Sequence, residues 1–128
     1  MIDWTVIDHF TEREFQRPDL LRPQMINKLD ELREMCGFPL RLTSTFRTPE
    51  QNAALPGAAK YSAHLASPVD GLYSGVDILT ANLSASQLWS LTMGIFSVEI
   101  TRLGFYPSHL HIDCEPHPPQ RVIWVGKD

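Results

Sequence analysis

Two histidines and an aspartate alternate along one short segment, His109-Leu110-His111-Ile112-Asp113. Every second side chain of a strand points to the same face, so both imidazoles and the carboxylate would share a face while Leu110 and Ile112 point into a core. Zinc accepts imidazole nitrogen and carboxylate oxygen, and a catalytic zinc keeps three protein ligands and one open position. Together with His64 and an aspartate that follows it, one or both strand histidines could hold a metal. The same groups could also form a hydrogen-bonded row without one.

The elements that must position these groups are predicted by start, stop and periodicity signals. Helices are predicted over residues 23–36, from Thr48 to Leu55 and from Ser84 to Ile95, with a short one after the capping box Thr11–Glu14. Strands are predicted over 40–44, 76–79, 99–103, 109–114 and 121–125, and a long loop over 58–75. Short turns separate the last three strands, so we expect an antiparallel meander in an α+β domain.

The composition indicates a soluble, globular chain. Its 128 residues suit one domain, spanning 1–128, and 43% of them are hydrophobic. The net charge of -4 disfavours nucleic-acid binding, and no apolar run approaches the roughly 18 residues of a membrane span. The first residues lack the features of a secretory signal, so we expect synthesis in the cytoplasm. We also expect a monomer in which Cys36 and Cys114 are unpaired, buried thiols.

Four motifs carry a resemblance to a known family. They are TFRTPEQN at 45–52, YSAHL at 61–65, GVDI at 75–78 and LGFYPSHLHID at 103–113. In this order they resemble the zinc D-alanyl-D-alanine carboxypeptidase family of peptidoglycan peptidases. Phage endolysin peptidases, vancomycin-resistance dipeptidases and the hedgehog signalling domain are relatives of that family. The resemblance implies a small, mainly antiparallel sheet with helices packed on one face, as in the hedgehog and DD-peptidase folds.

The resemblance also implies a site. His64, Asp77 and His111 match the family's ligands for one Zn²⁺ ion, and Arg47 matches the arginine that would hold a substrate carbonyl or carboxylate. The implied reaction is hydrolysis of an amide bond in peptidoglycan stem or cross-link peptides, by DD-carboxypeptidase or endopeptidase action, with zinc-bound water as the nucleophile. His109 either transfers a proton or supports a ligand.

Two further residues have expected supporting roles. We expect Ser62 to cap or orient the loop that carries His64. We expect Asp113 to hydrogen-bond a ligand imidazole rather than to bind the metal.

The sequence departs from the family pattern at two places. Asp77 follows His64 by 13 positions, which exceeds the usual spacing, indicates an insertion at 66–74 and makes Asp70 a rival ligand. We favour Asp77, because a buried strand holds a carboxylate more firmly than a loop does.

The second departure is Ser108, which stands where several family members place a catalytic glutamate. Two functions therefore stay open: a wall peptidase, phage-encoded or virion-associated, and a non-catalytic domain that binds wall peptide or protein with structural zinc.

Overall fold

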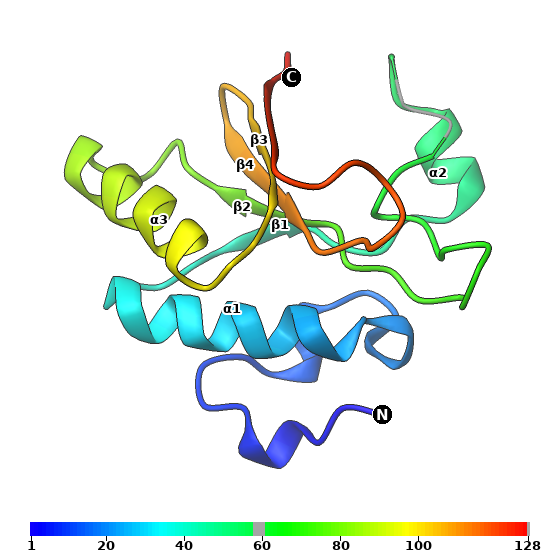
Figure 1. Cartoon of the computed structure of the whole chain (residues 1–128), viewed down its shortest axis with the longest axis horizontal. Coiled ribbons are helices and arrows are strands. Elements are labelled where there is room, and N and C mark those ends of the chain that lie inside the picture. Colours follow the sequence, from blue (N-terminus) through cyan, green and yellow to red (C-terminus); the bar gives the residue numbers. More distant parts are fainter. Residues whose placement is uncertain (58–60, 128) are drawn as a thin grey trace.

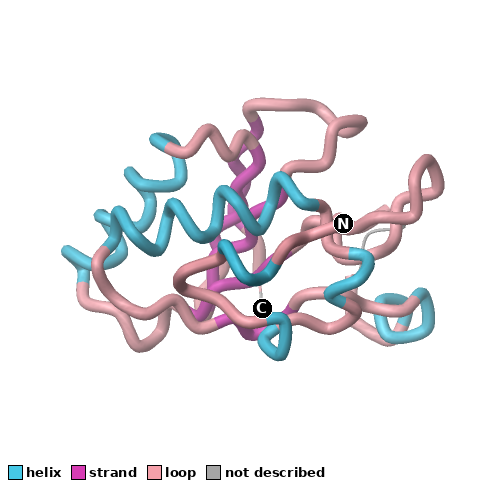
Figure 2. Tube along the Cα trace, turned by 90° about the horizontal axis from the view of Figure 1, so that it is seen from below, coloured by secondary structure: helices cyan, strands magenta, loops and turns pink. Residues whose placement is uncertain are grey.

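The computed structural model describes residues 1–57 and 61–127, so positions 58–60 of the predicted loop lie outside the described residues. Helices α1 and α3 pack together against a five-stranded sheet, while α2 lies apart at one end (Figure 1). Seen from below, helical segments lie in front of the strands (Figure 2). The helices are α1 (Pro23–Cys36), α2 (Pro49–Ala53) and α3 (Ala85–Ser97). The strands are β1 (Leu42–Ser44), β2 (Val76–Leu79), β3 (Arg102–Phe105), β4 (His109–Asp113) and β5 (Val122–Val125). The predicted α+β class, with a mainly antiparallel sheet, is confirmed.

Helix α1 forms where its signals predict it. Pro23 occupies the first turn, where a missing amide hydrogen is tolerated, and Gly37 ends the helix in the left-handed conformation with φ 74°. Its apolar stripe is fully buried against the sheet and α3, and consists of Met25, Ile26, Leu29 and Leu32. This packing supports the sheet from one side only.

Strand register builds the opposite face of the sheet. The sheet order is β1-β2-β4-β3-β5, and Asp77 of β2 lies directly opposite His111 of β4. His111 in turn lies opposite Gly104 of β3, which pairs with Trp124 of β5. Directly opposed residues share a face, so these four positions form one row across the sheet. Leu110, between the strand histidines, is 1% exposed and faces the helices as predicted.

The predicted meander is wrong for the last strand. β3 and β4 are antiparallel, but β5 pairs with β3 in parallel. Both edges of β4 are already occupied, by β2 and by β3, so the next strand cannot pair with β4, and it pairs with the free edge of β3 instead. It still runs opposite to β4, and is therefore parallel to β3.

The predicted strand at 99–103 is displaced toward the carboxyl end of the chain. The amide of Ile100 still donates to the carbonyl of Ile95 in α3, and Glu99 has a φ of 61°, so β3 begins only at Arg102. The capping box at Thr11 opens a single turn of 3-10 helix, Glu12–Glu14. Shifts of this size are usual where an element ends in a turn.

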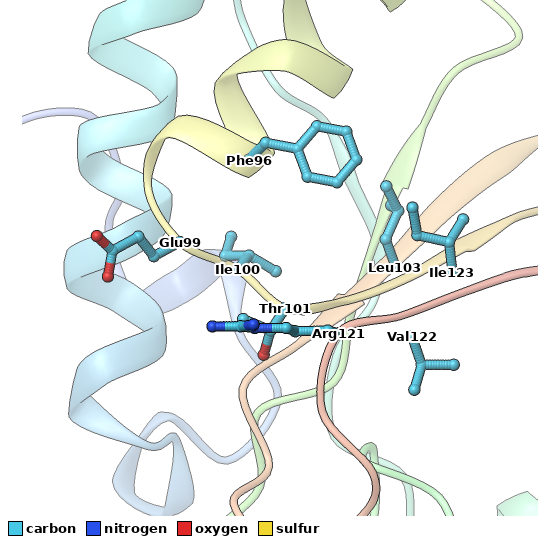
Figure 3. Close-up of a pocket in the computed structure, with 8 residues that line it drawn as sticks. All are labelled: Phe96, Glu99, Ile100, Thr101, Leu103, Arg121, Val122 and Ile123. Atoms are coloured by element: carbon cyan, nitrogen blue, oxygen red, sulfur yellow. The ribbon is translucent and has the colours of Figure 1, made fainter.

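A groove runs between the end of α3 and β5, and it is lined in part by Phe96, Ile100 and Ile123 (Figure 3).

Cys36 and Cys114 are free, as predicted, but each thiol is half-buried rather than buried. Among residues 1–57 and 61–127, no helix has both the length and the apolar character needed to cross a membrane.

Candidate metal centre

Three side chains converge on the sheet face that the helices leave uncovered. Asp77 comes from β2, His111 from β4, and His64 from the loop between α2 and β2. The Nε2 atom of His64 lies 3.2 Å from Asp77 Oδ1 and 3.1 Å from His111 Nδ1. The third side of the triangle, His111 Nδ1 to Asp77 Oδ1, is 3.0 Å. All three residues are buried, so the three atoms face one another rather than solvent.

Backbone contacts fix the position of His64. The Oγ of Ser62 accepts a hydrogen bond of 3.2 Å from the His64 amide, which is the orienting contact expected of Ser62. The carbonyl of Thr45 bonds to His64 Nδ1 on the outer side of the ring. Gly75 allows the loop to approach β2 closely, since a Cβ there would lie 2.6 Å from the His64 amide nitrogen. The loop is therefore held at both the backbone and the ring.

A buried carboxylate fixes the orientation of His111. Asp113 is fully buried, and its Oδ2 lies 2.8 Å from His111 Nε2. Its other oxygen accepts from Arg102 Nε at 2.8 Å and from the Glu115 amide at 3.1 Å. Burial raises the pKa of the Asp113 carboxyl, but the bond to His111 and the charges nearby outweigh it and lower that pKa. Asp113 is thus an anion aimed at the far side of the imidazole.

These outer bonds determine which ring nitrogens carry hydrogen. A carbonyl and a carboxylate only accept, so His64 donates through Nδ1 and His111 donates through Nε2. The nitrogens that face inward then present lone pairs, and both point at the Asp77 carboxylate. Three acceptors at about 3 Å repel one another unless something positive lies among them.

The electrostatics of the metal-free protein agree with this description. Burial lowers the pKa of His64, which favours its neutral, ligating form. Burial opposes ionisation of Asp77, yet its contacts with the His111 and His64 rings hold its carboxyl pKa well below the usual range. Burial likewise opposes charge on His111, but the contacts with Asp113 and Asp77 outweigh it and raise its pKa. A divalent cation among the three inward atoms would relieve the repulsion between them, and the donor set of two imidazoles and one carboxylate suits zinc.

The second oxygen of Asp77 faces two further groups. Arg47 Nη2 lies 3.4 Å from Asp77 Oδ2, and His109 Nε2 lies 3.7 Å from the same atom. Asn52 of α2 receives the other arm of the guanidinium, with Nη1 to Oδ1 at 3.3 Å. The Arg47 and His109 side chains are each 22% exposed, so both can reach a molecule bound above the cluster. The structure therefore brings all five predicted metal and catalytic residues together.

Comparison with known proteins assigns the chain to a family. A family model described as Peptidase M15 matches residues 5–115. The chain belongs to the peptidase M15 family. No curated protein and no solved structure gives a significant match. The M15 family consists of zinc-dependent peptidases, so membership indicates a metallopeptidase, and His64, Asp77 and His111 form a possible metal site.

The M15 chain resolves the competition between its two aspartates by geometry. Asp70 lies in the inserted segment and pairs with Arg22, Oδ2 to Nη1 at 2.6 Å, while Asp77 completes the cluster. Arg22 also binds the buried carboxylate of Glu115, with Nη2 to Oε1 at 2.9 Å. Asp70, in the middle of the insertion, is thereby attached to Arg22 at the start of α1.

Sequence reasoning missed four residues that shape the M15 site. The Thr45 carbonyl selects the tautomer of His64, and Asn52 holds Arg47. Tyr106 stacks on His109, and Trp124 packs against His111. Two of them carried a signal in the sequence: Asn52 is an amide in the first turns of a helix that begins beside Arg47, and Tyr106 lies in the LGFYPSHLHID motif beside His109.

Proposed function

We propose that the chain is a zinc peptidase that hydrolyses an amide bond in peptidoglycan stem or cross-link peptides, as a DD-carboxypeptidase or an endopeptidase. One observation supports this most strongly: three inward-facing ligand atoms lie directly beside an accessible guanidinium and an accessible imidazole. A purely structural metal site has no need of such neighbours, because its ligands close around the ion. The proposed place of action is the bacterial cell wall, and the proposed source is a phage or its virion.

His64, Asp77 and His111 would hold the ion. When bound, zinc supplies a Lewis acid for the scissile carbonyl and lowers the pKa of a bound water toward about 7. Arg47 carries two donor groups on a planar guanidinium, and these suit a substrate carboxylate or a carbonyl oxygen that gains negative charge. The His109 imidazole can accept and release a proton at Nε2, which suits general acid–base catalysis. Asp113 keeps the His111 ring in its ligating tautomer.

A second candidate function is a non-catalytic domain that binds wall peptide or protein with structural zinc. Ser108 favours it, because this residue stands where several family members carry a glutamate that transfers the proton. The Oγ of Ser108 lies 3.2 Å from His109 Nδ1, so the serine contacts the imidazole. Catalysis at this site therefore requires His109 to transfer the proton that the glutamate transfers in those family members.

Hydrolysis of purified cell walls tests the proposal. Zinc-loaded protein is incubated with walls of several chemotypes, with and without a chelator, and the released peptides are identified by mass spectrometry. We expect the protein to release peptides with new amino or carboxyl ends, and we expect the chelator to prevent this release. Asp77→Asn should abolish the release. Asp70→Asn is the matched control, because Asp70 pairs with Arg22 outside the cluster, and it should keep full activity. Zinc binding without cleavage of any wall type would favour the binding domain.

A further inference from the structure

Two aromatic side chains form a continuous contact with the site histidines. The indole Nε1–H of Trp124 donates to the Tyr106 hydroxyl at 3.0 Å. The Tyr106 ring lies flat on the His109 imidazole, with centroids 4.6 Å apart and planes 7° apart. The Trp124 ring also contacts His111, with centroids 5.5 Å apart and planes inclined by 45°. The hydrogen bond between Trp124 and Tyr106 thus connects the ring beside His111, a candidate ligand, to the ring beside His109, the candidate proton-transfer group.

Two glycines make room for these rings. A Cβ on Gly104 would lie 2.5 Å from Trp124 Cε2, and a Cβ on Gly126 would lie 2.1 Å from Tyr106 Cε1. Neither glycine has a positive φ, so backbone conformation does not require glycine at either position. Their contribution is space: Gly104 lets the indole lie over β3, and Gly126 lets the phenol ring lie beside the imidazole.

We propose that Trp124 and Tyr106 are positioning residues that hold the His109 imidazole against Asp77 Oδ2; this inference rests on the proposed function. The torsion that turns a histidine ring is broad, so a partly exposed imidazole needs neighbours to fix its plane. His109 has Ser108 at one nitrogen and Asp77 at 3.7 Å from the other. The stacked Tyr106 ring determines the plane in which both contacts occur, and Trp124 holds Tyr106 in place.

Trp124 reaches the site from β5, at the edge of the sheet. The parallel pairing of β5 with β3 places Trp124 opposite Gly104, which is two strands from Asp77, so Trp124 is three strands from it. Trp124 thus completes the surroundings of the site from the edge strand of the sheet. In a chain with Ser108 in place of a glutamate, its contact with Tyr106 orients His109, the proposed proton-transfer group.

Conservative variants test the positioning role. Trp124→Phe removes the donor, Tyr106→Phe removes the acceptor, and the double variant removes both while keeping an aromatic ring at each position. We expect each to lower kcat about threefold to tenfold, as the loss of one hydrogen bond allows, with KM and zinc content unchanged. The double variant should be no slower than either single variant, because all three lose the same bond. Trp89→Phe is the matched control, since Trp89 is 69% exposed on α3, and it should leave kcat unchanged.

A spectroscopic readout tests the same inference without activity. In the wild-type protein, the stacked Tyr106 ring should shift the His109 ring-proton resonances upfield, and Trp124→Phe and Tyr106→Phe should reduce that shift. Gly126→Ala, which displaces the Tyr106 ring, should abolish it, while Val125→Ala at the neighbouring exposed position should not. Unchanged resonances in these variants, or a loss of kcat that follows a loss of zinc, would overturn the inference. If the wild type cleaves nothing, the proposed function fails, and the resonances still decide whether Trp124 and Tyr106 hold His109.

Discussion

Replacing Asp113 with asparagine should weaken zinc binding without removing any ligand. Asp113 Oδ1 accepts from Arg102 and from the Glu115 amide, while Oδ2 accepts from His111 Nε2. An asparagine has only one side-chain oxygen. That oxygen has to take the position of Oδ1, because Arg102 and the Glu115 amide both donate hydrogen bonds there. The amide NH₂ then faces His111 Nε2, which has to become an acceptor. His111 moves its hydrogen to Nδ1, the atom that faces His64 and Asp77, and its ligating lone pair is lost.

The size of the effect follows from the buried hydrogen bond. If His111 keeps its ligating tautomer in the variant, its Nε2–H faces the NH₂ group of the asparagine, and neither can accept a hydrogen bond. Because position 113 is fully buried, these unpaired donors cost about 1–3 kcal/mol. Zinc affinity should therefore fall roughly 5- to 150-fold at 25 °C. That range includes the 10- to 100-fold loss typical when a partner of a ligating histidine is replaced.

Competition with a chromogenic chelator at fixed pH measures the dissociation constant for zinc in wild type, Asp113→Asn and Asp70→Asn. The last variant makes the same chemical change at a carboxylate bound to Arg22, and it should bind zinc as the wild type does. A dissociation constant for Asp113→Asn within about twofold of the wild-type value would refute the tautomer argument. Circular dichroism of the metal-free proteins checks that all three are folded.

Three further predictions concern catalysis, acid stability and packing. His109→Ala should retain zinc but lose wall hydrolysis by about 10²- to 10⁴-fold, and full turnover would remove His109 from the mechanism. The bond to Arg22 lowers the pKa of the Asp70 carboxyl. The stability that Asp70 adds over Asp70→Asn should therefore be present above about pH 4 and vanish as the pH falls through that lowered value; thermal melts that show the gap widening in acid would contradict this. Leu29→Ala, at a fully buried position in α1, should reduce the free energy of unfolding by about 2–5 kcal/mol in urea titrations, and a loss below about 1 kcal/mol would show looser packing than the structure has.

Local pattern predicted much of the site. The alternation in β4 was enough to place His109, His111 and Asp113 on one face, because side-chain direction in a strand depends only on parity. The apolar neighbours of Asp77 indicated a buried strand, which the structure contains as β2. Capping signals predicted the bounds of α1 and the start of α3, since caps act within a few residues of a helix end.

Contacts between residues far apart in the sequence could not be predicted from local pattern. The parallel pairing of β5 depends on which sheet edge is free after β2, β3 and β4 have paired, and no residue within β5 encodes that. The contacts of Trp124 with Tyr106 and His111 follow from this pairing and were missed with it. The Thr45 carbonyl was missed for another reason: every residue carries a carbonyl, so its role depends only on where His64 is placed.

The central claim is that His64, Asp77 and His111 together hold one zinc ion. Anomalous diffraction from zinc-loaded crystals, collected on both sides of the zinc absorption edge, tests it most directly. The expected result is one zinc peak per chain within about 2.0–2.2 Å of His64 Nε2, His111 Nδ1 and an Asp77 oxygen, with a coordination position left for a non-protein ligand. A peak at any other place, no peak at these three residues, or a fourth protein ligand closing the site would contradict the claim.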